Sequence, residues 1–185
     1  MKKISIFGGY SDVSHEDSED ISKLGKFLSL KNKKTIFLIG GFVGYLKSFV
    51  SKIPNKKERV CVVGTIQGKR FGFHSNGAKE LKFLFTNGYF GKKKKLFDQT
   101  VNGFIILPGS DKSLGVLAEL VESIDHINSF DVFVNQVPRP VILYGEYWRQ
   151  FINDIIYTRI SDITKKHIHF VKKGCYDDIA KILNL

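Results

Sequence analysis

Short apolar runs alternate along the chain with segments whose apolar residues recur at helical spacing. Continuous apolar runs of this length are typical of strands that a parallel sheet buries on both faces. We expect strands at residues 3–7, 35–39, 60–63, 82–86, 103–107, 141–144 and 167–171. Leu24, Phe27 and Leu28 follow the i, i+3, i+4 spacing of a helix over residues 18–30. Further helices are expected at 43–51, 92–100, 112–127, 148–157 and 176–183, whereas residues 67–77 show no clean period.

The alternation of strands and helices predicts the fold class. Strands that are separated by helices pair in parallel through right-handed crossover connections. We therefore expect an α/β protein with a three-layer, Rossmann-like, doubly wound architecture and a mostly parallel sheet of six or seven strands. No linker, repeat or low-complexity tract divides the chain, so residues 1–185 are expected to form one domain.

Glycine and proline gather where the predicted strands end. In an open α/β sheet the ligand lies beyond the carboxyl ends of the strands, and backbone N–H groups at such turns can bind a phosphate. Lysines 92–95 add positive charge beside these turns. The candidate phosphate-binding or nucleotide-binding residues are Gly8, Gly9, Tyr10, Ser11, Gly40, Gly41, Val43, Gly44, Lys93, Lys94, Pro108, Gly109, Ser110, Lys112 and Ser113.

Composition narrows the possible partners. The net charge of +11 comes mostly from lysine, and we interpret it as a compositional bias of the surface rather than as a nucleic-acid interface. No apolar stretch is long enough for a membrane span, and the N-terminus lacks the pattern of a signal peptide, so a cytoplasmic protein without a membrane partner is expected. With two cysteines and no zinc-type spacing, the sequence indicates no disulfide framework, metal or resident cofactor.

Four segments, in order, resemble the LOG family, once labelled lysine decarboxylase-like, within the wider SLOG group of Rossmann-like proteins. They are Gly8-Gly9-Tyr10-Ser11, Ile39-Gly40-Gly41-Phe42-Val43-Gly44, Val63-Gly64-Thr65-Ile66 and Asn102-Gly103-Phe104-Ile105-Ile106-Leu107-Pro108-Gly109. The resemblance runs from Ile4 to about Asn153. It implies cleavage of the N-glycosidic bond of a nucleoside 5′-monophosphate, with release of the base and ribose 5-phosphate, and it implies a homodimer.

The chain departs from the family at both catalytic motifs. Where the family reads Met-His-x-Arg-Lys, this chain has Phe90-Gly91-Lys92-Lys93-Lys94, so Lys93 stands at the catalytic arginine position. The second family motif reads Pro-Gly-Gly-x-Gly-Thr-x-x-Glu. In this chain the motif begins at Pro108, and Val116 stands at the position of the catalytic glutamate. Glu119 is the nearest acid, but a step of three residues turns it about 60° around a helix.

The loss of the glutamate is the more serious change. Cleavage develops positive charge on the ribose, and a positioned acid or base is typically worth about 10²–10⁴ in rate. Valine supplies neither function, whereas lysine in place of arginine keeps the charge and loses the bidentate geometry.

Three hypotheses follow. The first is a LOG-like protein that binds a nucleotide or a phosphorylated ribose with little or no phosphoribohydrolase activity. The second is an active hydrolase that uses Lys93 with a displaced acid such as Glu119, or with a carboxylate from a dimer partner. The third is a nucleic-acid-binding protein, for which Tyr89 and Phe90 offer an aromatic platform.

Overall fold

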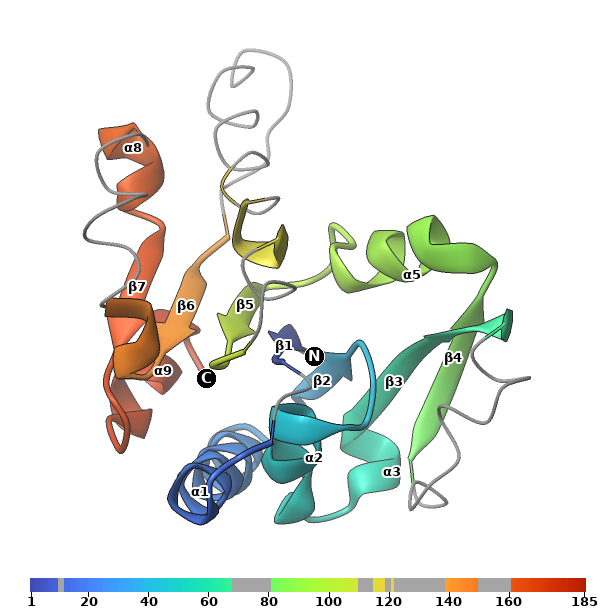
Figure 1. The fold of residues 1–185 in the computed structure, drawn as a ribbon, viewed down its shortest axis with the longest axis horizontal. Coiled ribbons are helices and arrows are strands. Elements are labelled where there is room, and N and C mark those ends of the chain that lie inside the picture. The colour runs from blue at the N-terminus through green and yellow to red at the C-terminus, as the bar shows by residue number, and fades with distance from the viewer. Residues whose placement is uncertain (10–11, 68–80, 110–114, 119–120, 122–138, 150–160) are drawn as a thin grey trace.

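The computed structural model describes residues 1–9, 12–67, 81–109, 115–118, 121, 139–149 and 161–185, and the statements that follow concern these ranges. Seven strands form one sheet in the order β4-β3-β2-β1-β5-β6-β7, and every pair of neighbours is parallel (Figure 1). The strands are β1 (Lys3–Phe7), β2 (Ile36–Ile39), β3 (Val60–Thr65), β4 (Lys82–Thr86), β5 (Gly103–Ile106), β6 (Val141–Tyr144) and β7 (Ile168–Val171).

Helices cover both faces of the sheet and complete three layers (Figure 1). They are α1 (His15–Lys31), α2 (Gly44–Ser51), α3 (Lys56–Arg59), α5 (Gly88–Leu96), α8 (Asp162–Lys165) and α9 (Tyr176–Ile182), and residues 115–118 and 146–149 are also helical. On one face, α1, α2 and α9 pack on strand residues such as Ile4 and Phe37. On the other face, Leu96 of α5 and Trp148 pack with Phe104.

The fold class predicted from the sequence is confirmed, and the sheet is parallel throughout. The predicted strands at 3–7, 82–86 and 141–144 coincide with β1, β4 and β6, while β3 continues to Thr65, beyond the predicted end. Helix α1 begins at His15 rather than at residue 18, because the Ser14 side chain accepts a hydrogen bond from the Asp17 backbone N–H at 3.1 Å and caps the helix there. The lysine-rich helix α5 starts and ends earlier than expected.

Sequence reasoning missed two short helices, and some of the elements that it predicted fall on residues outside the described ranges. Helices α3 and α8 have four residues each, which is too few to show an apolar period. Residues 68–80 and most of the helices predicted at 112–127 and 148–157 lie outside the described ranges. Across the part of the chain that the structure describes, no helix has the length and apolar character needed to cross a membrane.

The order of strands reverses at β1, whose neighbours are β2 on one side and β5 on the other. Hydrogen bonds join the turns that follow β1 and β5. The Leu107 N–H donates to the Phe7 carbonyl at 2.8 Å, and the Gly9 N–H donates to the Pro108 carbonyl at 3.3 Å. This reversal is the topological switch point at which open α/β sheets bind ligands.

Gly25 sets the distance between α1 and α2. A Cβ atom at this position would lie 2.0 Å from the Phe49 carbonyl oxygen, and backbone atoms cannot move aside as a flexible side chain can. The two helices therefore touch where α1 has no side chain. Helix α2 also packs against the turn that follows β1, where a Cβ atom on Gly8 would lie 3.1 Å from Tyr45 Cβ.

We expect Gly25→Ala to lower the free energy of unfolding by about 1–3 kcal/mol, because the helices must separate, although alanine favours a helix by about 1 kcal/mol over glycine. Gly115→Ala is the matched control, since no atom of the described residues lies within 4 Å of the added Cβ atom. Chemical denaturation measures both variants. Equal stabilities of Gly25→Ala and the wild type would contradict the close approach.

Candidate functional site

A cavity of about 720 Å³ lies at the switch point, which we call the switch-point cavity. Its walls come from the ends of β1, β2 and β3, from one side of α5, from Leu46 of α2, and from Gly115 and Val116. The lining residues are Ile6, Phe7, Gly8, Gly40, Leu46, Thr65, Gln67, Gly88, Tyr89, Lys92, Lys93, Leu96, Phe97, Gly115 and Val116. A cavity of this size suits a small molecule, since ligand pockets usually measure about 300–1,000 Å³.

Glycine at position 40 allows α5 to pack over the end of β2. A Cβ atom on Gly40 would lie 3.3 Å from both Lys92 Cε and Leu96 Cδ1, which is tighter than an ordinary contact. The stem of Lys92 therefore lies over the strand end. Ser5 Oγ of β1 also donates a hydrogen bond of 2.6 Å to the Leu96 carbonyl, which fixes the last turn of α5 to the central strand.

The charge on the cavity wall is positive. Lys92 and Lys93 line the cavity, and none of its described lining residues is acidic. The Lys93 ammonium lies 4.9 Å from the centre of the Tyr89 ring, one turn earlier on α5. Most of the other lining residues are apolar, so the cavity combines a basic side with an apolar wall.

The structure brings part of the predicted site together. Gly8, Gly40 and Lys93 share the switch-point cavity, and the Gly9 turn is hydrogen-bonded to Pro108 at its edge. The described candidates that do not line the cavity are Gly9, Gly41, Val43, Gly44, Lys94, Pro108 and Gly109, and the Lys94 side chain is exposed. The candidates Tyr10, Ser11, Ser110, Lys112, Ser113 and Glu119 lie outside the described residues.

Val116 lies on the cavity wall, and its half-buried side chain packs against the core around Phe104. The position at which the resemblance expects a carboxylate is therefore at the cavity, but it is apolar. Sequence reasoning missed Thr65, Gln67 and Lys92 as lining residues. The rule that ligands lie beyond strand ends pointed to Thr65 and Gln67, because both follow the apolar part of β3.

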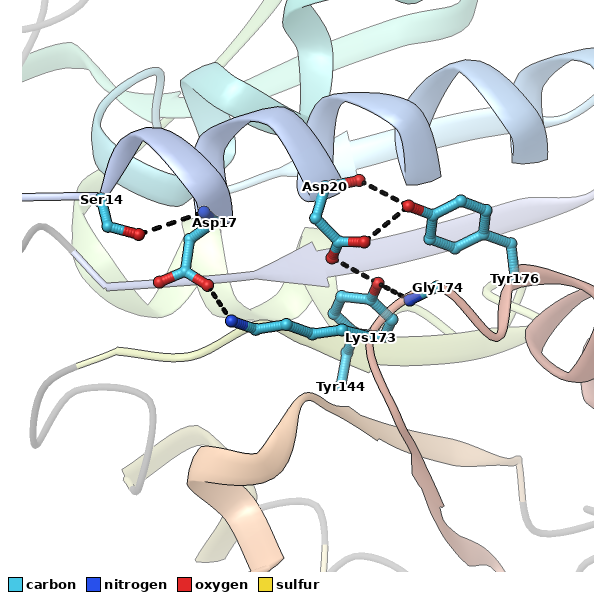
Figure 2. Close-up of polar contacts among 7 residues, drawn as sticks. All are labelled: Ser14, Asp17, Asp20, Tyr144, Lys173, Gly174 and Tyr176. Carbon is cyan, nitrogen blue, oxygen red and sulfur yellow. Dashed lines mark hydrogen bonds and ion pairs between the residues drawn. The ribbon is translucent and has the colours of Figure 1, made fainter.

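A group of hydrogen-bonded polar residues lies at the carboxyl end of β6 (Figure 2), and none of its members lines the cavity. The Asp20 carboxylate accepts hydrogen bonds from the Tyr144 hydroxyl at 2.5 Å and from the Tyr176 hydroxyl at 2.6 Å. The Gly174 N–H donates to the Tyr144 oxygen at 3.1 Å. We call these four residues the Asp20 cluster; it joins α1 to β6 and to the turn between β7 and α9.

The Asp20 cluster holds its phenols in the neutral form. Burial, followed by the hydrogen bond to Asp20, raises the pKa of Tyr144 above its ordinary range, and the same two causes raise the pKa of Tyr176. Beside the cluster, Lys173 forms an ion pair with Asp17 in the first turn of α1 (Figure 2). Together these contacts fix the beginning of α1, which directly follows the β1 turn.

These features define a Rossmann-like α/β protein with a ligand-sized cavity at the switch point of its sheet. In comparisons with known proteins, no protein-family model and no curated protein matches the chain. Among solved structures, the chain is similar to the molybdenum cofactor binding protein of the phototrophic bacterium Rippkaea orientalis, with a TM-score of 0.62 and 14% identity over 99% of this chain and 95% of that one. It is also similar to the molybdenum cofactor carrier protein of Chlamydomonas reinhardtii, with a TM-score of 0.62 and 14% identity over 100% of this chain and 99% of that one. At this identity, the likeness establishes a shared fold over the full length.

The raised tyrosine pKa values predict a loss of stability in alkaline solution. The unfolded chain releases its phenol protons above about pH 10, whereas folded Tyr144 and Tyr176 keep theirs, so the free energy of unfolding falls as the pH rises beyond that value. We expect the melting temperature to fall more steeply between about pH 9 and pH 11 in the wild type than in Tyr144→Phe. Tyr89→Phe, at an exposed tyrosine, is the control and should keep the wild-type slope. If the melting temperatures of the wild type and of Tyr144→Phe fall with pH at the same slope, the raised pKa of Tyr144 is contradicted.

Proposed function

We propose that this protein binds a nucleotide or a phosphorylated ribose in the switch-point cavity, as a LOG-like binding protein with little or no phosphoribohydrolase activity. The observation that carries the proposal is a ligand-sized cavity that combines two lysines with an apolar wall and lacks an acidic residue among its described lining. Such a wall suits a ligand with an anionic group and an apolar, planar part.

The position of the cavity supports a phosphate-bearing ligand. The cavity opens where β1, β2 and β3 end, the region in which Rossmann-like sheets bind nucleotides. Lys92 and Lys93 supply charge-assisted hydrogen-bond donors for a phosphate. Gly8 and Gly40 place the backbone that follows β1 and β2 on the cavity wall.

The lining also supports the absence of efficient hydrolysis. Val116 occupies the cavity wall where the LOG resemblance places the catalytic glutamate, and a valine can neither stabilise a cationic sugar nor activate water. The alternative, an active hydrolase, needs an acid from elsewhere, either Glu119 or a carboxylate from a partner. Glu119 lies outside the described residues, and no partner chain is present to test the homodimer that the resemblance implies, so both remain predictions.

A single-stranded nucleic acid is the alternative with less support. Tyr89 and Phe90 are 61% and 83% exposed beside the lysines of α5, as a stacking platform requires. However, this pair occupies one turn of one helix, whereas single-strand binding proteins follow roughly 4–16 nucleotides along a groove. A small ligand therefore fits the described surface better.

A second candidate ligand comes from the structural neighbours, whose names state that they bind or carry the molybdenum cofactor. The likeness extends over nearly the whole of both chains. That cofactor is a phosphate-bearing pterin, so it shares an anion and a planar heterocycle with a nucleotide. The basic and apolar walls of the cavity suit both ligands.

Calorimetry tests the binding proposal. We expect AMP and ribose 5-phosphate to bind, and adenosine, which lacks the phosphate, to bind more weakly. Lys92→Ala and Lys93→Ala should each weaken AMP binding roughly tenfold, as expected for a hydrogen bond to a charged group. Lys95→Ala is the matched control, because its exposed side chain lies on α5 but does not line the cavity. The proposal fails if neither AMP nor ribose 5-phosphate binds the wild type.

Chromatographic detection of adenine tests the catalytic part. We expect the wild type to release adenine from AMP at least about 10²-fold more slowly than a LOG enzyme with its glutamate in place. Val116→Glu should raise the rate, and Val116→Gln, which lacks the carboxylate, should not. A wild-type turnover of about one per second that Glu119→Gln abolishes would overturn the proposal. It would show that Glu119 acts as the acid in place of the missing glutamate, since a positioned acid or base typically contributes about 10²–10⁴ in rate.

A further inference from the structure

Tyr89 is an aromatic residue that lines the switch-point cavity while most of its side chain is exposed to solvent. It lies in the first turn of α5, lines the switch-point cavity and is 61% exposed. Aromatic rings bury large apolar areas when they find a partner, and an exposed ring beside a cavity offers that area to a ligand. The adjacent Phe90 is 83% exposed but does not line the cavity, so the two rings differ in what they can contact.

The face of the Tyr89 ring is directed toward the basic side of the cavity. The Lys93 ammonium lies 4.9 Å from the ring centre, which is within the range of a cation–π contact. A flat group that stacks on this face of the Tyr89 ring takes the position of the Lys93 ammonium, and the displaced ammonium then lies next to the same ligand. Ring and ammonium are therefore positioned to bind two parts of one molecule, a heterocycle and an anion.

The rest of the wall favours the same kind of ligand. Leu96, Phe97 and Val116 present apolar side chains to the cavity, and Leu96 is almost fully buried. A free phosphate or a sugar phosphate uses the lysines but leaves the Tyr89 ring and this apolar wall in contact with water. A ligand that also carries a planar heterocycle covers both.

We propose that Tyr89 is the stacking surface for the planar heterocycle of the cavity's ligand, and so the residue that selects a heterocyclic phosphate over a plain sugar phosphate; this rests on the proposed function. The shared chemistry is a flat, nitrogen-containing ring system that carries a phosphate. The purine of a nucleoside monophosphate and the pterin of a phosphorylated pterin both satisfy it. Stacking on an aromatic residue tolerates different rings, because every such ring has a π face.

Calorimetry with matched ligands and matched variants tests the proposal on the full chain. The ligands are AMP, ribose 5-phosphate, which lacks the base, and neopterin monophosphate as the pterin source. The variants are Tyr89→Ala, Tyr89→Phe, which keeps the ring, and Phe90→Ala as the neighbouring aromatic control. Melting curves show that each variant is folded before binding is measured.

We expect Tyr89→Ala to weaken the binding of AMP, of neopterin monophosphate, or of both by about tenfold, in line with the loss of one stacking contact. Ribose 5-phosphate should change less than about threefold, since its contacts are with the lysines. Tyr89→Phe and Phe90→Ala should retain wild-type affinity. The relative affinities of the two heterocyclic ligands then identify which source the cavity prefers.

Two results overturn the inference while the proposed function stands. In the first, Tyr89→Ala weakens AMP and ribose 5-phosphate by the same factor, which assigns Tyr89 to holding Lys93 rather than to stacking. In the second, Tyr89→Ala leaves every affinity unchanged. Failure of the proposed function gives a different result, since then neither AMP nor ribose 5-phosphate binds the wild type. If neopterin monophosphate binds in that case and depends on Tyr89, the stacking role stands with a pterin ligand; if no ligand binds, both proposals fall.

Discussion

Parallel pairing of β1 with strands on both sides is the constraint on which the rest of the molecule depends. Ile4 of β1 is opposite Phe37 of β2 and Gly103 of β5, and it is fully buried. A strand with two parallel neighbours needs helices on both faces of the sheet, because its side chains alternate between them. The switch-point cavity lies where the order of strands reverses, since the chain leaves β1 in one direction through β2, β3 and β4 and later returns to its other side at β5.

The elements that sequence reasoning located well are those whose information is local. Runs such as residues 141–144 are apolar in every position and form a fully buried strand, so composition alone specifies them. Helix α3 was missed because four consecutive polar residues, Lys56–Arg59, carry no apolar period. The start of α1 was misplaced because one hydrogen bond, from the Asp17 N–H to the Ser14 side chain, decides it.

For the candidate site, the sequence predicted the strand ends that line the cavity, but not the wall that α5 forms opposite them. Gly8 and Gly40 could be predicted because they directly follow apolar runs. Which side chains of α5 reach the cavity depends on how the helix is rotated over β2, and that rotation is fixed by tertiary contacts, such as the Ser5 hydrogen bond to the Leu96 carbonyl. The Asp20 cluster could not be predicted at all, since a carboxylate that accepts from two distant phenols leaves no periodic pattern.

The Asp20 cluster also bears on the order in which the chain can fold. Asp20 is separated by 124 residues from Tyr144 and by 156 residues from Tyr176, so its hydrogen bonds close very long loops. The entropic cost of such closure has to be met before the bonds contribute, and contacts of this separation usually form late. During synthesis, α1 and the first strands emerge long before either tyrosine. The beginning of α1, and with it the turn after β1, therefore acquires its final support only when β7 and α9 have docked. Because Gly8 of this turn lines the switch-point cavity, assembly of the cavity wall is tied to completion of the whole sheet.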